Sequence, residues 1–303
     1  MNPIKIFKAG SDAETRAAES IWYENWLLLK KNRSAMFGLY IIIFFVFLAV
    51  FAPVVAPFDP YLQNIDLRKM TYFSWPYILG TDDFGRDILS RIIYGSRISL
   101  VIGFFAVSIS LVFGSLVGLI SGFYGGWFDR IAMRVIDIML AFPYILLTIV
   151  IVALLGPTLL NAMIAIGIAR LPQYTRIMRA SVLAEKEAEY VEAERSLGVD
   201  NLELMFMSIL PNCLAPIIVQ ATLGVGSAII ESAALSFLGL GAQPPTPEWG
   251  LMIASAREFV SNAWWIVTFP GIAIVLVVLG FNLLGDGIRD VLEIGRASCR
   301  ERV

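Results

Sequence analysis

The chain has 303 residues, of which 58% are hydrophobic and 16% charged, and its formal net charge at pH 7 is −2. So apolar a composition excludes a soluble globular domain, and the small negative charge argues against nucleic-acid binding. The chain has no histidine and no Gly-Lys dipeptide, so it contains no P-loop, zincin motif or Ser-His-Asp triad. Its two cysteines, Cys213 and Cys299, form no paired metal motif. We therefore predict a membrane protein without catalytic residues, metal site or bound cofactor.

Long runs of apolar residues predict where the chain crosses the membrane, because about 20 such residues span roughly 30 Å of hydrocarbon. The first run lies between Arg33 and Asp59, too long and too far from the N-terminus for a cleaved signal sequence. The second lies between Arg97 and Asp129. Two more share 131–178 with a turn at 156–160, a fifth covers 212–241 and a sixth 264–285. The sequence predicts an all-α membrane protein with about six transmembrane helices.

The distribution of Lys and Arg predicts the orientation of these helices, since short cytoplasmic loops retain cations. With the N-terminus inside, the cytoplasmic segments hold 17 of the 23 Lys and Arg residues, including those from Arg170 to Arg195. Both termini are then cytoplasmic. The predicted divisions are a cytoplasmic N-terminal segment (1–34), the first transmembrane helix (35–57), an extracytoplasmic loop with an interfacial helix (58–97), a five-helix core (98–293) and a tail (294–303).

The predicted outer loop contains the stretch "LGTDDFGRDILSRIIYGSRISL" at residues 79–100. Its glycines permit backbone bends and its charged side chains can form a local network. The motif residues are Gly80, Asp82, Gly85, Arg86 and Asp87. Asp82, Asp83 and Asp87 also allow a calcium interpretation, but their spacing is not that of the twelve-residue calcium loop. We expect no metal here, and a helix from Ile88 lying in the outer interface.

Glu231 lies within the fifth apolar run, where an ionisable residue is costly and usually has a partner or a water-filled surface. At about 1.5 Å per residue it lies roughly 25 Å along that helix, near the outer end of the membrane. One interpretation is a polar group that lines a translocation path or binds the amino terminus of a substrate. The interpretation we favour is a structural carboxylate, bonded to neighbouring backbone where "LSFLGLG" breaks the helix.

The segment "EAEYVEAERSLGVDNLELMFMSILPN", residues 187–212, lies between two very hydrophobic stretches and is predicted to face the cytosol. Gly198 suits the left-handed position that ends a helix, and Asp200 with Glu203 forms a capping-box pattern. We therefore predict short helices at 180–197 and 200–210, with Pro211 stopping or kinking the second. The residue pattern alone leaves two alternatives open, a docking element and an amphipathic loop on the bilayer surface.

This segment resembles the cytoplasmic "EAA…G…LP" signature of ABC importer permeases, which favours the docking alternative. Glu192 and Ala193 match the signature, and Gly198 follows six residues after Glu192. Leu210 and Pro211 close the motif, whereas Glu194 stands where the family usually has alanine. The resemblance implies that the coupling loop at 180–212, between helices 4 and 5, docks on ATPase subunits. The residues expected at this contact are Glu192, Ala193, Gly198, Asp200, Leu210 and Pro211.

Other stretches resemble the dipeptide, oligopeptide and nickel branch of these permeases, of the second-permease type. They are residues 27–60, residues 79–100 and "ESAALSFLGLGAQPPTPEWGLMI" at 231–253. The resemblance implies a bacterial inner-membrane permease that works with a second homologous permease, two ABC ATPase subunits carrying ATP-Mg, and an extracytoplasmic substrate-binding protein. Residues 294–303 depart from the family's chain ends, so we interpret them as a non-native tail and assign them no function.

The expected function is import of short peptides, with a nickel complex as the alternative cargo in the same branch. An alternative from another class is an ion-coupled secondary transporter, which usually shows intramembrane acidic or histidine relays and an internal repeat. The sequence shows neither, and only Glu231 and Asp137 are acidic within predicted spans. A membrane scaffold that transports nothing would leave the match at 187–212 without a role.

Overall fold

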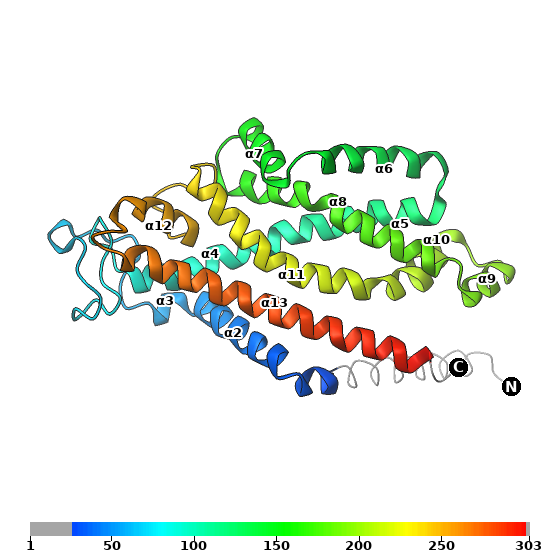
Figure 1. The fold of residues 1–303 in the computed structure, drawn as a ribbon, viewed down its shortest axis with the longest axis horizontal. Helices are drawn as coiled ribbons and strands as arrows, with labels where there is room; N and C mark the ends of the chain where they lie inside the picture. The colour runs from blue at the N-terminus through cyan, green and yellow to red at the C-terminus, as the bar shows by residue number, and fades with distance from the viewer. Residues whose placement is uncertain (1–25, 301–303) are drawn as a thin grey trace, which may run out of the picture.

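The computed structural model describes residues 26–300, with side chains for 26–293. The described chain is a long bundle of helices (Figure 1). The helices are α2 (Arg33–Val50), α3 (Ala52–Val55), α4 (Ile88–Ile109), α5 (Ser115–Tyr124), α6 (Gly126–Ala141), α7 (Tyr144–Leu155), α8 (Leu159–Glu185), α9 (Glu189–Ser196), α10 (Asn201–Glu203), α11 (Leu210–Phe237), α12 (Trp249–Ala256) and α13 (Trp265–Arg300). The all-helical membrane fold predicted from the sequence is confirmed.

Within the described residues, four helical runs are long and apolar enough to cross a membrane. They are Arg33–Val50, Ile88–Tyr124, Asn201–Phe237 and Trp265–Glu293. The pair α6 and α7, which meet at a 98° bend, would make a fifth. Helix α8 has 27 residues, enough to cross, but carries three arginines, Arg170, Arg176 and Arg179. Six spans therefore remain a prediction, with α8 as the span in question.

The third predicted helix is broken rather than continuous. Helix α6 ends at Ala141, Phe142 is extended at φ −91° and ψ 140°, and α7 starts at Tyr144. Pro143 between them has no amide hydrogen, and the residue before a proline disfavours helical backbone, which explains the break. The predicted turn at 156–160 is present, with Gly156 at φ 97° ending α7 and Thr158 capping α8.

The interfacial helix predicted within 88–97 is wrong, because these residues are the first turns of α4, which continues through a π-helical segment into α5. Most of this part of α4 is buried by protein; Arg91 is only 3% exposed. Close packing fixes it there, since a Cβ on Gly95 would approach the Trp249 side chain to 2.6 Å. The segment therefore belongs to the bundle and does not lie flat on a membrane surface.

The two ends of the bundle differ in character (Figure 1). The loop at 56–87 and helix α12 lie at one end, and α9 and α10 lie at the other, toward which the last turns of α13 also run. Helix α13 packs against α2 and α11, and α5 packs against α8. That both chain ends share the cytoplasmic side of the membrane with the 180–212 loop stays a prediction.

Candidate functional site

The coupling segment (residues 180–212) projects from the bundle as the short helix α9 and a sharp bend. Helix α9 ends at Ser196, and Gly198 has φ 83°, the left-handed conformation predicted for it. A Cβ at this position would meet no atom within 4 Å, so the backbone angle rather than space favours glycine. The Asp200 side chain accepts a hydrogen bond from the amide of Leu202 at 3.1 Å and caps the following helix as predicted.

Side-chain contacts hold α9 against the base of α11. Val191 is fully buried, and the Glu194 carboxylate accepts a hydrogen bond from the Ser208 hydroxyl at 2.6 Å. The Tyr190 hydroxyl donates to Glu185 at 2.8 Å and accepts from the Asn212 amide at 3.1 Å. Burial raises the pKa of Tyr190 to about 12, with the Glu185 hydrogen bond adding to the shift. Glu194, which departs from the family signature, therefore has a role inside the segment.

Pro211 neither stops nor kinks a separate helix, contrary to the prediction. Residues Asn201–Phe237 form one continuous run, in which Leu204–Ile209 adopt a π-helix. In this wider turn the amide of Leu210 bonds the carbonyl of Met205, five residues back. The change in hydrogen-bond register just before Pro211 lets the helix pass a residue that cannot donate.

The coupling segment exposes the residues predicted to dock, together with apolar side chains. Glu192, Ala193, Gly198 and Pro211 are exposed, and Leu210 is partly buried. Leu197 is 84% exposed and Met207 is 75% exposed. Leu202 and Phe206 are also exposed apolar side chains of this segment. Exposed apolar side chains of this kind are typical of a contact with another protein or with the membrane surface.

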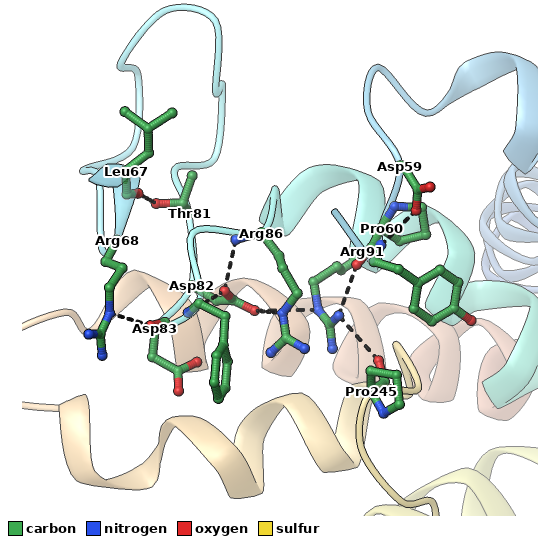
Figure 2. Close-up of polar contacts among 12 residues, drawn as sticks. Asp59, Pro60, Leu67, Arg68, Thr81, Asp82, Asp83, Arg86, Arg91 and Pro245 are labelled. Carbon is green, nitrogen blue, oxygen red and sulfur yellow. Dashed lines mark hydrogen bonds and ion pairs between the residues drawn. The ribbon is translucent and has the colours of Figure 1, made fainter. Parts of the chain in front are cut away.

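At the opposite end, a buried charge cluster organises the outer segment (residues 56–87) (Figure 2). Asp82 accepts from the Arg86 guanidinium at 2.7 Å and from the Arg86 backbone amide at 2.9 Å. Arg91 lies 3.6 Å from the Asp82 carboxylate and donates to the carbonyls of Pro60 at 3.0 Å and Pro245 at 3.4 Å. Arg91 thus ties two outer loops to α4. Arg91 lies within the stretch quoted at 79–100, but its contacts with Pro60 and Pro245 could not be predicted from the sequence, because they depend on how the loops fold.

The glycines and acids of the outer motif have separate roles. Gly80 and Gly85 have φ 78° and 73°, as expected of bends. Asp87 caps α4 through the Ser90 amide at 2.8 Å. Since Asp82 pairs with Arg86 while Asp87 caps a helix, these carboxylates do not converge on a shared point. Among the described residues no group of three His, Cys, Asp or Glu is placed to hold a metal.

A further buried acid, Glu248, lies outside the motif and was not predicted. Its carboxylate caps α12 by accepting from the amides of Gly250 at 2.9 Å and Leu251 at 2.7 Å. The adjacent Trp249 is fully buried and donates to the carbonyl of Ile92 at 3.0 Å, which fastens α12 to α4. Burial raises the pKa of the Glu248, Asp87 and Asp83 carboxyl groups, with the Asp82 charge also raising that of Asp83.

Glu231 pairs with an arginine instead of with neighbouring backbone. The guanidinium of Arg170 on α8 donates to both carboxylate oxygens, at 2.5 and 3.0 Å, and the Tyr144 hydroxyl also donates to the carboxylate. Arg170 had been counted among cytoplasmic cations, while Glu231 was placed near the outer face. That count is wrong for Arg170, which lies 11 residues, about 16 Å, from the start of α8 and meets Glu231 inside the bundle.

Helices long enough to cross a membrane, with an exposed helical element at one end and an ordered loop platform at the other, define this chain as a helical membrane protein. Residues 114–296 match the family described as the binding-protein-dependent transport system inner membrane component. Residues 20–75 match the N-terminal transmembrane domain of oligopeptide transport permease C. The chain therefore belongs to the binding-protein-dependent inner-membrane permeases, within the ABC importer branch that carries this N-terminal domain.

Characterised relatives cover nearly the whole chain. The dipeptide transport system permease protein DppC of Alkalihalophilus pseudofirmus is 52% identical over 276 residues, 91% of this chain and 90% of the relative. DppC of Haemophilus influenzae is 50% identical over 285 residues, 92% of this chain and 96% of the relative. The glutathione transport system permease protein GsiD of Escherichia coli is 42% identical over 274 residues, 90% of each chain.

Among solved structures, the chain resembles one from the MetNI methionine ABC transporter in an inward-facing conformation. The TM-score is 0.55 at 20% sequence identity, and the match covers 67% of this chain and 97% of the other. At this identity the likeness concerns the fold. It agrees with the permease architecture described above.

Proposed function

We propose that this chain is one transmembrane subunit of an ATP-driven importer of short peptides. Support for the cargo comes from the relatives, whose names specify dipeptide or di- and tripeptide transport at about 50% identity. The relative at 42% identity is named for glutathione, which is itself a small peptide. These names favour peptides over the nickel complex that the branch also allowed. Membership of a binding-protein-dependent family sets aside an ion-coupled transporter.

The proposed assembly contains this chain, a second homologous permease, two ABC ATPase subunits and an extracytoplasmic substrate-binding protein, all in the bacterial inner membrane. ATP-Mg is bound and hydrolysed by the ATPase subunits, because this chain has no P-loop sequence. Its own part is to bind the partners, provide half of the path and transmit their conformational change.

The observation that carries the proposal is the geometry of the coupling segment. Helix α9 stands at the end of the bundle, is bonded through Glu194 to Ser208 in the π-helical turn that leads into α11, and exposes Glu192 together with apolar side chains. A partner that binds α9 tightly in one conformational state and weakly in another would therefore displace α11 along with α9. A ligand-driven switch needs such unequal contacts in its two states. We assign the docking contact to Glu192, Ala193, Gly198, Asp200, Leu210 and Pro211.

Polar side chains on α8 and α11 indicate which face lines the path. The amide of Gln220 donates to Gln173 at 3.4 Å, and Glu231 with Arg170 lies further along the same two helices. Polar groups within membrane-spanning helices face a protein interior or water in preference to lipid. This face is therefore assigned to the path and the second permease, with Glu231 as a structural carboxylate at its outer part.

The outer segment supplies the proposed contact with the binding protein. Its tip presents Trp75, 89% exposed, and Phe73, 80% exposed, on a loop anchored to the bundle through Arg91 and Asp82. Exposed aromatic side chains on a rigid support are typical of protein contact sites. We therefore assign Gly80, Asp82, Gly85, Arg86 and Asp87 the role of holding this surface in place.

The test is ATP hydrolysis by the complete complex reconstituted in vesicles, with and without peptide-loaded binding protein. Loaded binding protein should stimulate hydrolysis and drive peptide uptake. Gly198→Pro should preserve insertion and abolish both, because proline fixes φ near −65° where Gly198 has φ 83°. Glu192→Ala should weaken both, whereas Glu187→Ala, an exposed acid ahead of α9, serves as the matched control.

Other results would change the proposal in specific ways. Stimulation by nickel-loaded binding protein alone would keep the mechanism and replace the cargo. Normal coupled transport by Gly198→Pro would overturn the docking assignment. Failure of the chain to assemble with any ATPase would overturn the importer proposal as a whole.

A further inference from the structure

An apolar groove runs between α2 and α4. The α2 wall is made by Val46, Ala49 and Val50. The α4 wall is made by Leu100, Val101, Phe104, Phe105 and Ser108, with Arg97 at one end. Val101 is 54% exposed and Phe104 48% exposed, so the groove is open along its length.

Arg97 closes the end of the groove that points toward the outer segment. Its guanidinium donates to the carbonyls of Ala49 at 3.0 Å and Val50 at 3.2 Å, the last residues of α2. A guanidinium has five N–H donors, so three are left to bind another acceptor. The side chain is exposed, and the residues that line the groove include one cation and no acid. The site therefore carries a net positive charge at one end only.

The dimensions of the groove match one leaflet of a bilayer. Helix α2 has 18 residues, about 27 Å, so its C-terminal end beside Arg97 lies where a hydrocarbon core of roughly 30 Å ends. From Arg97 to Ser108 the groove follows 11 residues of α4, about 16 Å, close to half that thickness. A cation thus stands at interface depth above an apolar channel one acyl chain long.

We propose that this groove binds an anionic glycerophospholipid of the leaflet on the side of the outer segment. The phosphate accepts hydrogen bonds from the guanidinium of Arg97, which suits phosphate geometry, and an acyl chain lies along Val101, Phe104 and Phe105. A headgroup with no cation of its own is selected, because a second positive charge beside Arg97 would be repelled. The bound lipid covers the end of α2 and joins it to α4.

The experiment measures lipid retention by the purified complete complex with native mass spectrometry, during titration with phosphatidylglycerol or phosphatidylcholine of identical acyl chains. We expect phosphatidylglycerol to bind at least about tenfold more tightly, because both lipids offer a phosphate but Arg97 repels the choline cation of phosphatidylcholine. Arg97→Ala should abolish this preference and Arg97→Lys should keep part of it. Arg68→Ala, which alters an exposed arginine of the outer segment, should leave it unchanged.

A second variant tests the groove without changing the hydrogen bonds between Arg97 and the end of α2. Val101→Trp fills the channel from an exposed position and should reduce phosphatidylglycerol binding, whereas Val275→Trp, on an exposed part of α13 outside the groove, should not. Equal binding of both lipids, or unchanged binding in Val101→Trp, would overturn the proposal. So would a complex that retains no lipid and loses its second permease in Val101→Trp, because the groove would then be a subunit interface.

Discussion

At the scale of single residues, the pair formed by Arg170 and Glu231 carries the largest predicted effect. Both charges are mostly buried, with side chains 6% and 18% exposed. Removing one partner of a buried pair leaves the other charge uncompensated and typically costs about 3–5 kcal/mol. We expect Arg170→Ala to lower the free energy of unfolding by that order, measured by reversible denaturation in mixed micelles.

Two comparisons separate this effect from a general loss of packing. The double variant Arg170→Leu/Glu231→Leu should recover most of the stability, since apolar replacement of a whole buried pair is often neutral. Arg176→Ala breaks the exposed pair with Asp137, whose side chains are 54% and 56% exposed, and should cost at most about 1 kcal/mol. If Arg170→Ala and Arg176→Ala cost the same, the buried pair has no special role in stability.

The outer acids predict a dependence of local stability on pH. Burial raises the pKa values of Asp87 and Glu248 in the folded protein, so the folded outer segment binds protons more readily than the unfolded chain. Their contribution to stability is therefore greatest below the ordinary carboxyl pKa values of about 4, and declines as the pH rises through the raised values. Backbone amides at 88–92 and 250–252 should show higher protection factors at about pH 5 than at about pH 7.

Hydrogen exchange, corrected for the intrinsic effect of pH on exchange rate, measures this difference. The double variant Asp87→Asn/Glu248→Gln should remove it, because neither side chain can then titrate. Asp66→Asn, which changes an exposed acid on the same loop, should retain it. Protection that rises with pH in the unmodified protein would show that other groups dominate.

The pair of Arg170 and Glu231 also shows how much the sequence can predict about single residues. Glu231 stood out because it interrupts an apolar run, but its partner is 61 positions away on another helix. Counting cations along the chain assigned Arg170 to the cytoplasm, since that method registers charge and position but not contact. A partner that distant becomes visible only when α8 and α11 pack together.

At the scale of elements, glycines determine how closely α5 and the segment before it approach α8. Gly114, Gly118 and Gly122 recur every four residues and face α8. A Cβ on Gly118 would approach the Met178 Cβ to 2.9 Å and clash with the carbonyl of Thr175. Small residues at this spacing let membrane helices pack backbone to backbone.

We expect Gly118→Val to separate α5 from α8 and to lower the free energy of unfolding by about 1–3 kcal/mol or more, the usual cost of overpacking. Denaturation in mixed micelles measures the loss. Gly271→Ala is the matched control, because a Cβ there would meet no atom within 4 Å and α13 would gain a better helix former. Similar losses in the two variants would contradict a packing role for Gly118.

Local sequence predicted the element boundaries best where a single residue imposes a backbone angle. Gly198 and Gly156 end helices as their conformations require, and Asp200 begins the next one. Proline predicted helix ends less reliably. Pro143 breaks a helix that was predicted to be continuous, whereas the helix predicted to end at Pro211 continues past it. The helix continues past Pro211 because of the π-helical turn that precedes it, and no local sequence pattern predicted that turn.

At the scale of the whole molecule, the remaining prediction is the direction in which the bundle crosses the membrane. The structure places the outer segment and the coupling segment at opposite ends, so one pair of residues can decide it (Figure 1). Trp75 and Leu197 are 89% and 84% exposed at those ends. A cysteine at either position would be open to solvent without disturbing the packing of the bundle.

We expect a membrane-impermeant maleimide to label Trp75→Cys in intact spheroplasts and Leu197→Cys only after permeabilisation. Each variant is made in a background that lacks Cys213 and Cys299, so that labelling reports the new thiol alone. The cation count, 17 inside against 6 outside, predicts this result even with Arg170 reassigned, because the inside excess stays large. The reverse labelling pattern would place α9 outside the cell, where no ATP-driven subunit could reach it, and would overturn both the orientation and the proposed coupling.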